Sequence, residues 1–198
     1  MFTKKILTFL TFSVISLSCL AKVHSIEPDI FVQSTVNRAA ETLSGNFTKD
    51  ERIEKLKEIA KDTVDINGIG FYTLGSYRKT INDDQIEQYK ILFEQYFLKS
   101  FASRLAEYSN PEIQVISKKK LSEKYTMVSS TLEGTDQRPG VKIDWRVYTK
   151  DPGNPLIRDL IIEGLSLART QQEEFSSIIE SNDGDINALF ATLRDFVK

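Results

Sequence analysis

Cysteine and histidine are almost missing from this chain of 198 residues, which contains one of each, Cys19 and His24. Nucleophilic catalysis by serine or cysteine needs a base beside the nucleophile, and the only histidine lies close to the N-terminus. A structural zinc site needs about four cysteine or histidine ligands, more than this sequence contains. These absences argue against a Ser–His or Cys–His enzyme and against a zinc protein. We therefore expect no enzymatic activity and no cofactor.

Two short motifs that could bind ions lack required residues. Residues 182–185 (Asn-Asp-Gly-Asp) resemble the start of a calcium loop. However, no glycine stands at the sixth position of the loop, where one is required, and Arg194 stands where a bidentate glutamate is needed. Gly68 and Gly70 are not preceded by a strand or followed by Gly-Lys-Ser/Thr, so they do not form a phosphate loop. Carboxylates are abundant, but the sequence cannot show which of them lie together, and an acid/base pair stays open.

An excess of basic residues is also missing, since 26 Lys and Arg face 28 Asp and Glu. A nucleic-acid partner normally requires a basic face, so we expect none. The one basic cluster is Lys118-Lys-Lys120 with Lys124, which we interpret as a solvated hairpin turn. Docking to an anionic head group or an acidic partner is the lesser alternative.

The first 21 residues have the organisation of a secretory signal peptide. Lys4 and Lys5 precede an apolar run over residues 6–17, which is shorter than the roughly 20 residues needed to span a membrane. Residues 18–21 supply a cleavage site, while Cys19 leaves lipidation as a minor alternative. We expect export and a single domain over residues 22–198. Cleavage would leave 24 Lys and Arg against 28 Asp and Glu, a net charge of −4.

Helical periodicity dominates residues 28–108. Pro28 begins one apolar repeat, and Thr48 with Glu51 forms the capping box of a second. Residues 66–80, which contain three glycines, predict a short irregular helix that leads into a long one.

The long helix is predicted over residues 82–108, where neither Pro nor Gly occurs and Asn82 can cap the first turn. At about 1.5 Å per residue it would be roughly 40 Å long. Its apolar stripe is wider than one packing partner needs, because Leu92, Leu98 and Ala102 lie beside the main row of aromatic residues. The simpler interpretation is a core helix contacted on two sides. The alternative is that it also forms the wall of an apolar cavity.

A change to alternating periodicity predicts a sheet over residues 112–164. The clearest strand spans residues 141–149, where apolar side chains from Val141 to Val147 face one side. Short turns between the strands predict an antiparallel meander of about four strands. Two closing helices are predicted over residues 167–197. The predicted fold class is therefore α+β, an antiparallel sheet packed against a mostly helical half.

Several stretches resemble segments of the MlaC-like, toluene-tolerance family. Residues 71–80 (Phe-Tyr-Thr-Leu-Gly-Ser-Tyr-Arg-Lys-Thr) and 89–97 resemble its L-G-x-Y/W-R segment and the aromatic helix that follows. Residues 159–166 (Asp-Leu-Ile-Ile-Glu-Gly-Leu-Ser) and 169–175 resemble its D-x-x-x-E-G-x-S and R-x-x-F segments. Their order and spacing agree over nearly the whole chain. One departure is at residues 154–158, where the family usually has an aromatic residue before the Asp.

This resemblance implies a periplasmic phospholipid carrier that helps to maintain outer-membrane lipid asymmetry. It also implies an α+β cradle that encloses the acyl chains and leaves the head group in solvent. The implied partners are the phospholipid cargo, an inner-membrane ABC transporter complex of the MCE type and an outer-membrane lipoprotein complex.

Such a carrier needs an apolar pocket, because about 30 methylenes at about 0.8 kcal/mol each would otherwise face water. The residues that we expect to include its lining are Phe71, Leu74, Phe93, Phe97, Phe101, Met127, Trp145, Val147, Ile161, Leu165 and Phe175. About half of them should instead be ordinary core, since apolar residues are mostly inside. Tyr77 and Arg78 are candidates for contact with the head group or a partner.

Two other functions remain open. A binding adaptor of similar cup shape would have a filled core and a protein partner. A small hydrolase or isomerase would need a buried acid or base that the sequence does not place. Lipid that co-purifies with the protein would distinguish the carrier from the adaptor.

Overall fold

The computed structural model describes residues 25–107, 111–134 and 139–198. The predicted signal peptide, residues 1–21, and the last residue of the predicted long helix, Tyr108, lie outside the described residues. In the part of the chain that is described, no helix has the length and apolar character needed to cross a membrane.

Two helices open the fold, α1 (Pro28–Ser44) and α2 (Lys49–Thr63). Proline fits the first turn of α1 because the N–H that it lacks would have no helical partner there. The predicted capping box of α2 is present: the Thr48 hydroxyl accepts from the Glu51 N–H, and the Glu51 carboxylate accepts from the Thr48 N–H at 2.8 Å. Both predicted helix starts are confirmed.

The middle of the chain forms α3 (Ile66–Thr73), the short 3-10 helix η1 (Tyr77–Lys79) and the long helix α4 (Asp83–Leu105). This confirms the predicted irregular helix that leads into a long one. Asn82 caps α4 as predicted, since its side-chain oxygen accepts from the Gln85 N–H at 2.9 Å.

Helices α3 and α4 pack closely, and small and polar residues make this possible. An added Cβ at Gly70 would lie 2.9 Å from the Phe93 ring, so only glycine permits this approach. The hydroxyls of Thr73 and Tyr89 share a buried hydrogen bond of 2.8 Å between the same helices. Burial raises the pKa of the Tyr89 phenol above its ordinary value, and the hydrogen bond with Thr73 opposes that shift only in part.

One antiparallel sheet follows, with its strands adjacent in sequence order, and their bounds are β1 (Ile113–Ser122), β2 (Tyr125–Leu132), β3 (Val141–Tyr148), β4 (Leu156–Ile162) and β5 (Leu165–Ser166). The predicted meander is confirmed, with a fifth strand of two residues added to the four expected. In β3 the apolar side chains of Ile143, Trp145 and Val147 are buried, as the alternation predicts.

The prediction that Lys118-Lys-Lys120 forms a hairpin turn is wrong. These lysines lie within β1, and the turn consists of Glu123 and Lys124. A run of exposed polar side chains hides the alternation of this edge strand from a sequence pattern. Lysine suits such an edge because its charge hinders pairing with another chain.

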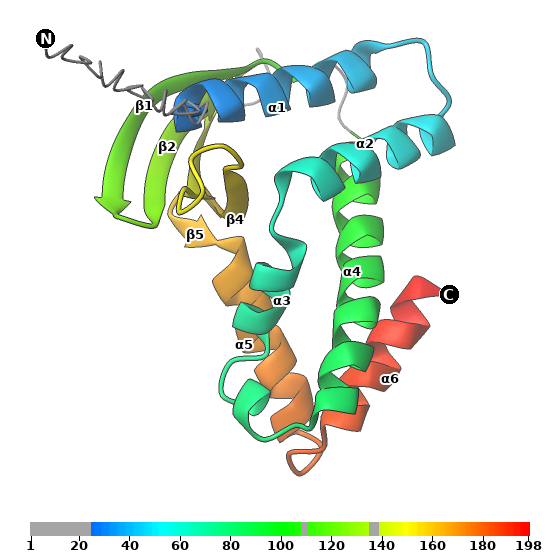
Figure 1. The fold of residues 1–198 in the computed structure, drawn as a ribbon. Helices are drawn as coiled ribbons and strands as arrows, with labels where there is room; N and C mark the ends of the chain where they lie inside the picture. The colour runs from blue at the N-terminus through cyan, green and yellow to red at the C-terminus, as the bar shows by residue number, and fades with distance from the viewer. Residues whose placement is uncertain (1–24, 108–110, 135–138) are drawn as a thin grey trace, which may run out of the picture.

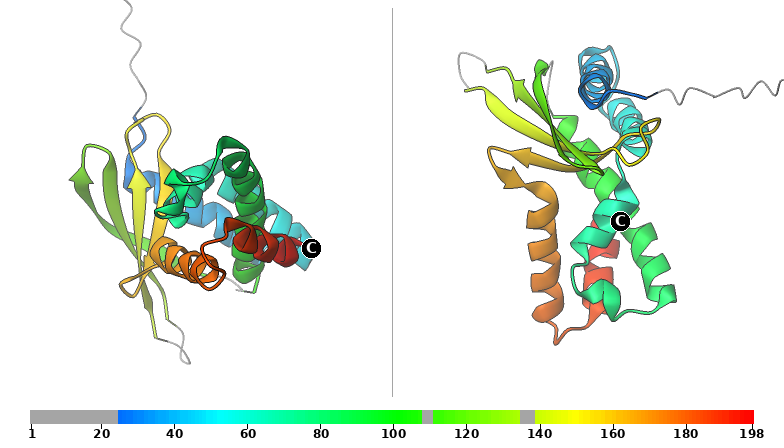
Figure 2. Two further views of the ribbon diagram at one scale, coloured as in Figure 1. Left: turned by 90° about the horizontal axis from the view of Figure 1, so that it is seen from below. Right: turned by 60° about the vertical axis from the view of Figure 1, so that its left-hand side comes forward.

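The fold closes with α5 (Leu167–Glu180) and α6 (Ile186–Val197). Ser166 and Asp185 cap them by accepting from the N–H groups of Arg169 and Asn187. Figure 1 shows the sheet, α1 and α2 at one end of the molecule and a bundle of α3 to α6 at the other, with α4 reaching from α2 to α6. The right-hand view of Figure 2 shows α5 leading away from the sheet into this bundle.

Helix α1 protects the free edge of the sheet. The Gln33 amide accepts from the Val115 N–H at 2.9 Å and donates to the Ile113 carbonyl at 3.2 Å, so it replaces a neighbouring strand. Lys118 of β1 forms ion pairs with Glu27 and Asp29 at the start of the same helix.

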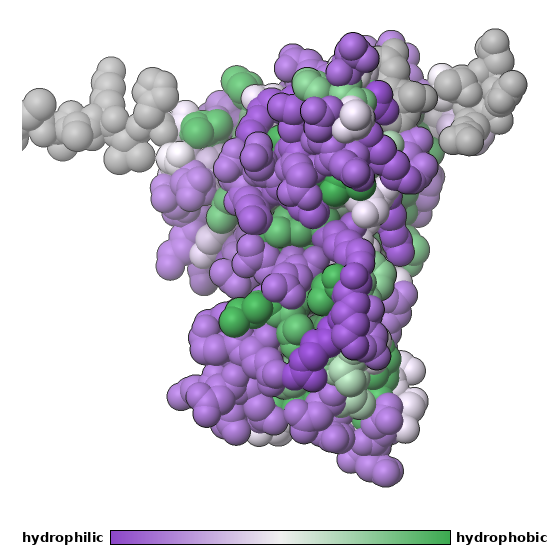
Figure 3. All heavy atoms as spheres, turned by 90° about the vertical axis from the view of Figure 1, so that its right-hand side faces the viewer, coloured by the Kyte–Doolittle hydropathy of each residue, from purple (hydrophilic) through white to green (hydrophobic). Residues whose placement is uncertain are grey.

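One large apolar core joins the two ends of the molecule. It contains Val32 of α1, Val128 and Trp145 of the sheet, Phe93 of α4 and Phe190 of α6. Figure 3 shows the right-hand side of the molecule, where polar residues dominate and the apolar ones form separate patches. Most of the buried apolar residues therefore pack in this core between the sheet and the helices.

Candidate functional site

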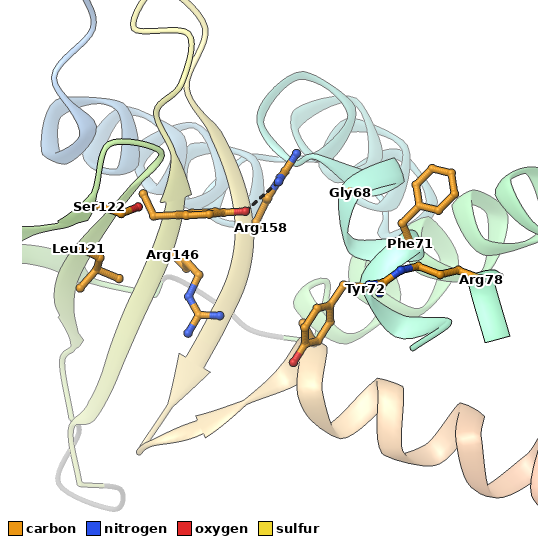
Figure 4. Close-up of a pocket in the computed structure, with 10 residues that line it drawn as sticks. Gly68, Phe71, Tyr72, Arg78, Leu121, Ser122, Arg146 and Arg158 are labelled. Atoms are coloured by element: carbon orange, nitrogen blue, oxygen red, sulfur yellow. Dashed lines mark hydrogen bonds between the residues drawn. The ribbon is translucent and has the colours of Figure 1, made fainter. Parts of the chain in front are cut away.

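A cleft of about 550 Å³, open to solvent, lies between the sheet and the helices α3, η1 and α5 (Figure 4). Its lining consists of Gly68, Phe71, Tyr72, Arg78, Leu121, Ser122, Tyr125, Arg146, Arg158 and Ala168. Apart from Gly68 and Ser122, these residues are apolar or aromatic side chains together with three arginines, and none of them is acidic. The cleft can therefore bind an apolar group and an anionic group of a ligand side by side.

The sheet presents one of its two faces to this cleft. Side chains alternate between faces along a strand, and paired residues share a face. Arg146 pairs with Met127, and Tyr125 pairs with Tyr148, so these four residues share the cleft face. Trp145 and its neighbours in register face the core instead. We call the two sides of the sheet the cleft face and the core face.

A bulge in β4 adds a second arginine to the cleft face. The register shifts between Arg146, which pairs with Asp159, and Val147, which pairs with Ile157, so Arg158 is the extra residue. A bulge of this kind lets consecutive residues point to the same side of a sheet. Arg158 and Asp159 accordingly both contact side chains of the cleft face.

The Arg158 guanidinium is held in place on three sides. It donates to Asp65 from Nε at 2.6 Å and to the Tyr125 hydroxyl from Nη1 at 2.8 Å, and it lies 3.8 Å from the centre of the Tyr148 ring. Burial alone would lower the pKa of Arg158, but the hydrogen bonds with Tyr125 and Asp65 outweigh burial, and the pKa is raised. Arg158 is therefore a fixed positive charge in the wall of the cleft.

The same interaction fixes the wall formed by α3. Asp65 is the N-cap of α3, where one oxygen accepts from the Gly68 N–H at 2.8 Å while the other binds Arg158. An added Cβ at Gly68 would lie 2.5 Å from the Asp65 carboxylate and 2.9 Å from Arg158 Nε. Glycine at this position thus lets the ion pair form against the backbone of α3.

Asp159 attaches α5 to the sheet. It is buried and accepts hydrogen bonds from the Ser166 hydroxyl at 2.6 Å and from the Ala168 N–H at 3.0 Å. Arg146 lies farther away, with its Nη1 atom 3.5 Å from the same carboxylate. The carboxylate is thus satisfied mainly by the start of α5, and Arg146 remains available to the cleft.

The structure brings two of the predicted site residues into the cleft, Phe71 and Arg78. Five others are buried in the core: Leu74, Phe93, Trp145, Val147 and Phe175. Three are half-buried against it: Tyr77, Phe97 and Phe101. Met127 and Ile161 are half-buried, and Leu165 is exposed. The role of each as a lipid contact stays a prediction.

Most of the residues that line the cleft were not among the predicted site residues. Tyr72, Tyr125 and Arg158 are amphipathic side chains, and neither helical nor strand periodicity distinguishes such residues as part of a binding site. The one available signal was the departure at residues 154–158, where Arg158 stands beside the family's Asp. Its significance depends on Asp65, which only the tertiary fold brings near.

This arrangement offers apolar and cationic contacts to a ligand. The cleft lining contains Ser122, but no histidine or carboxylate that could activate its hydroxyl. Over the described residues there is no group of three or more His, Cys, Asp or Glu side chains that could hold a metal ion.

Residues 32–195 match the sequence model of a family described as MlaC protein. The chain belongs to the MlaC family. The match covers the resemblance seen at residues 71–80 and 159–166, and that identification is confirmed.

The fold of this MlaC-family chain is similar to that of a phospholipid-binding protein from Ralstonia solanacearum, whose structure contains a phospholipid. The two agree with a TM-score of 0.73 over 87% of this chain and 97% of the other. At 19% sequence identity, the likeness shows that they share a fold and confirms the predicted α+β class.

Proposed function

We propose that this protein is a periplasmic phospholipid carrier that moves lipid between the outer membrane and an inner-membrane ABC transporter complex. The observation that carries the proposal is an open cleft with aromatic, apolar and cationic lining in a member of the MlaC family. Phe71, Tyr72 and Tyr125 offer apolar contact to acyl chains, and the arginines offer donors to a phosphate.

The size of the cleft indicates how the lipid is held. A two-chain lipid has on the order of 30 methylenes, each with about the volume of a water molecule, roughly 30 Å³. The cleft of about 550 Å³ holds the volume of only part of such a lipid. Loading therefore requires the cleft to widen, and Met127, which is half-buried and pairs with Arg146 of the lining, is one residue that an acyl chain could then contact.

Export of the protein is part of this proposal. The signal-peptide pattern of residues 1–21 and the MlaC family both favour the periplasm. There, the partners would be the inner-membrane transporter of the MCE type and an outer-membrane lipoprotein complex, and the role would be maintenance of outer-membrane lipid asymmetry and tolerance to toluene.

The test is native mass spectrometry of the processed protein purified without detergent. The proposal expects an added mass that matches one phospholipid, or uptake of one phospholipid from vesicles. A lipid-free mass, with no uptake from vesicles by the folded protein, would contradict the proposal.

A pair of variants locates the lipid. Tyr72 lines the cleft and is 42% exposed, while Phe196 of α6 is 43% exposed and is not part of the lining. Tyr72→Asp should reduce the lipid-bound fraction severalfold because it puts a carboxylate among the acyl chains. Phe196→Asp should leave it nearly unchanged. Equal losses in the two variants would place the lipid elsewhere.

The second candidate function is a protein-binding adaptor, and the packing of the core favours it. Leu74, Phe93, Val147 and Phe175 are all nearly inaccessible and contact one another or the same core, so they leave no space for a lipid there. An adaptor would show the lipid-free mass both as purified and after incubation with vesicles. The carrier would show a bound phospholipid in at least one of these two measurements.

A further inference from the structure

The charges that line the cleft are all positive. Arg78, Arg146 and Arg158 belong to the lining, and no Asp or Glu does. This contrasts with the chain as a whole, in which acidic residues outnumber basic ones by two. The overall composition is mildly acidic and does not explain a local excess of arginine. The positive charge of the cleft therefore indicates an anionic ligand.

The arginines differ in how far their charge is already neutralised. Arg158 is paired with Asp65 and serves to hold the wall. Arg146 is 39% exposed, and its nearest carboxylate, Asp159, is 3.5 Å away and already accepts from Ser166 and Ala168. Most of the donors of the Arg146 guanidinium therefore remain free for a ligand.

Arg78 has no hydrogen bond or ion pair to any described side chain. It is exposed on η1, across the cleft from the sheet. Figure 4 shows its guanidinium beside Tyr72, directed toward the cleft, and the Arg146 guanidinium extending from the sheet into the open space. Two guanidinium groups from opposite walls thus face one volume.

We infer that Arg78 and Arg146 form a head-group subsite that binds the phosphodiester of a lipid and selects lipids with a net negative charge. A guanidinium group can bind two phosphate oxygens at once, which makes arginine suited to this contact. A zwitterionic lipid brings an ammonium group as well, and the cleft lining contains no carboxylate to receive it. This inference rests on the proposed function and adds the head-group class to it.

The test is competitive extraction from vesicles that contain phosphatidylglycerol and phosphatidylcholine in equal amounts with identical acyl chains. Both lipids are offered on the same surface, so attraction of the protein to a charged vesicle affects them equally. Native mass spectrometry of the extracted complexes should show phosphatidylglycerol enriched by about fivefold or more. The enrichment should fall as salt is added, because ions screen the open cleft.

Variants then assign the preference to the two arginines. Arg78→Gln and Arg146→Gln should each bring the lipid ratio toward one while the total amount of extracted lipid changes less. Lys79→Gln is the matched control, because Lys79 is an exposed cation of the same short helix and does not line the cleft. Arg146→Lys should retain part of the preference, since it keeps the charge and loses the second donor.

The outcomes separate the inference from the proposed function. Equal extraction of the two lipids by the unchanged protein, or a preference that survives both Gln variants, overturns the subsite and leaves the carrier intact. Extraction of neither lipid overturns the carrier. Calorimetry of the lipid-free protein with inorganic phosphate tests whether the arginines bind free phosphate instead of a lipid head group. Binding that is lost in Arg78→Gln, without any lipid preference, would mean a site for free phosphate and would overturn the inference.

Discussion

The two faces of the sheet use the same strands for opposite purposes. On the core face, Val128, Trp145 and Val147 are buried, and the Trp145 indole N–H donates to the Ser130 hydroxyl at 2.8 Å. On the cleft face, Met127, Arg146 and Tyr148 are only half-buried, and the buried Asp159 beside Arg146 is a charged residue. The core face is filled by the protein's own side chains, whereas the cleft face retains open volume and charge.

This difference shows where a ligand can enter without unfolding the protein. The most apolar residues of the sequence are committed to joining the sheet to the helices. The accessible site lies on the face whose residues are amphipathic, where a ligand displaces water instead of core contacts. Each of the following predictions tests this difference, from the largest expected effect to the smallest.

Trp145→Ala should lower the free energy of unfolding by about 3–5 kcal/mol, because it leaves a cavity in the core and removes a hydrogen-bond donor from Ser130. Met127→Ala, on the cleft face of the adjacent strand, should cost less than about 2 kcal/mol because that side chain is only half-buried. Urea denaturation of both variants measures the difference. Equal losses would mean that the faces do not differ in packing.

The ion pair between Arg158 and Asp65 should be the strongest one in the cleft wall, since its side chains are 28% and 17% exposed. A double-mutant cycle with Arg158→Gln and Asp65→Asn should give a coupling energy of about 1–3 kcal/mol. The matched control is the pair of Arg38 and Asp62, which are 44% and 62% exposed and should couple by less than about 1 kcal/mol. A weaker coupling in the cleft pair than in the control would contradict a preformed wall.

Hydrogen bonds of tyrosine should contribute more to stability in the buried core than in the open cleft. Tyr89→Phe removes a buried bond to Thr73 and should cost about 1 kcal/mol of unfolding free energy. Tyr125→Phe removes a bond to Arg158 in the open cleft, where water can replace the hydroxyl, and should cost about half as much. Thermal unfolding of the two variants side by side checks the order, and the reverse order would argue against an open cleft.

The smallest effect concerns the attachment of α1 to the edge of the sheet, and it depends on pH. The hydrogen bond from Lys118 holds the pKa of Asp29 below its ordinary value, and burial opposes this only in part. A lowered pKa in the folded state means that the ion pair stabilises the protein above the ordinary pKa of Asp. That stabilisation is lost as the pH falls through the folded-state value.

Lys118→Gln should therefore lower the melting temperature slightly at neutral pH, and this loss should shrink as the pH falls through the lowered pKa of Asp29. Lys119→Gln, at the next position of the same strand, is the control and should show no such pH dependence. A difference between Lys118→Gln and the unchanged protein that persists in acid would contradict the ionic attachment.

Local chemistry explains which parts of the fold could be predicted from the sequence. Thr48 and Asn82 mark helix starts because their side chains satisfy backbone N–H groups within a single turn. The alternation from Val141 to Val147 likewise identifies a strand and its buried face. Helix caps and strand alternation both depend only on residues that are close in sequence. The lysine run of β1 carries no such alternation, so only the start of this strand, over residues 112–116, was predicted.

The cleft could not be predicted in this way because its parts come from distant segments. Arg78 was a candidate through the family resemblance, but Arg146 stands at a position that alternation assigns to the solvated side of the sheet, and Arg158 reaches the same face through a bulge. Only the packing of α3 against the sheet turns that side into a cleft. Phe93 and Phe175 were candidates because they are apolar, which is also the property that places them in the core.

The measurement that tests the central claim most directly is a crystal structure of the protein loaded with phosphatidylglycerol. The account predicts a head-group phosphate within hydrogen-bonding distance of Arg78 and Arg146, and acyl chains that enter between the sheet and α3 on the cleft face. A phosphate far from both arginines, with chains that reach the core face by another route, would contradict it.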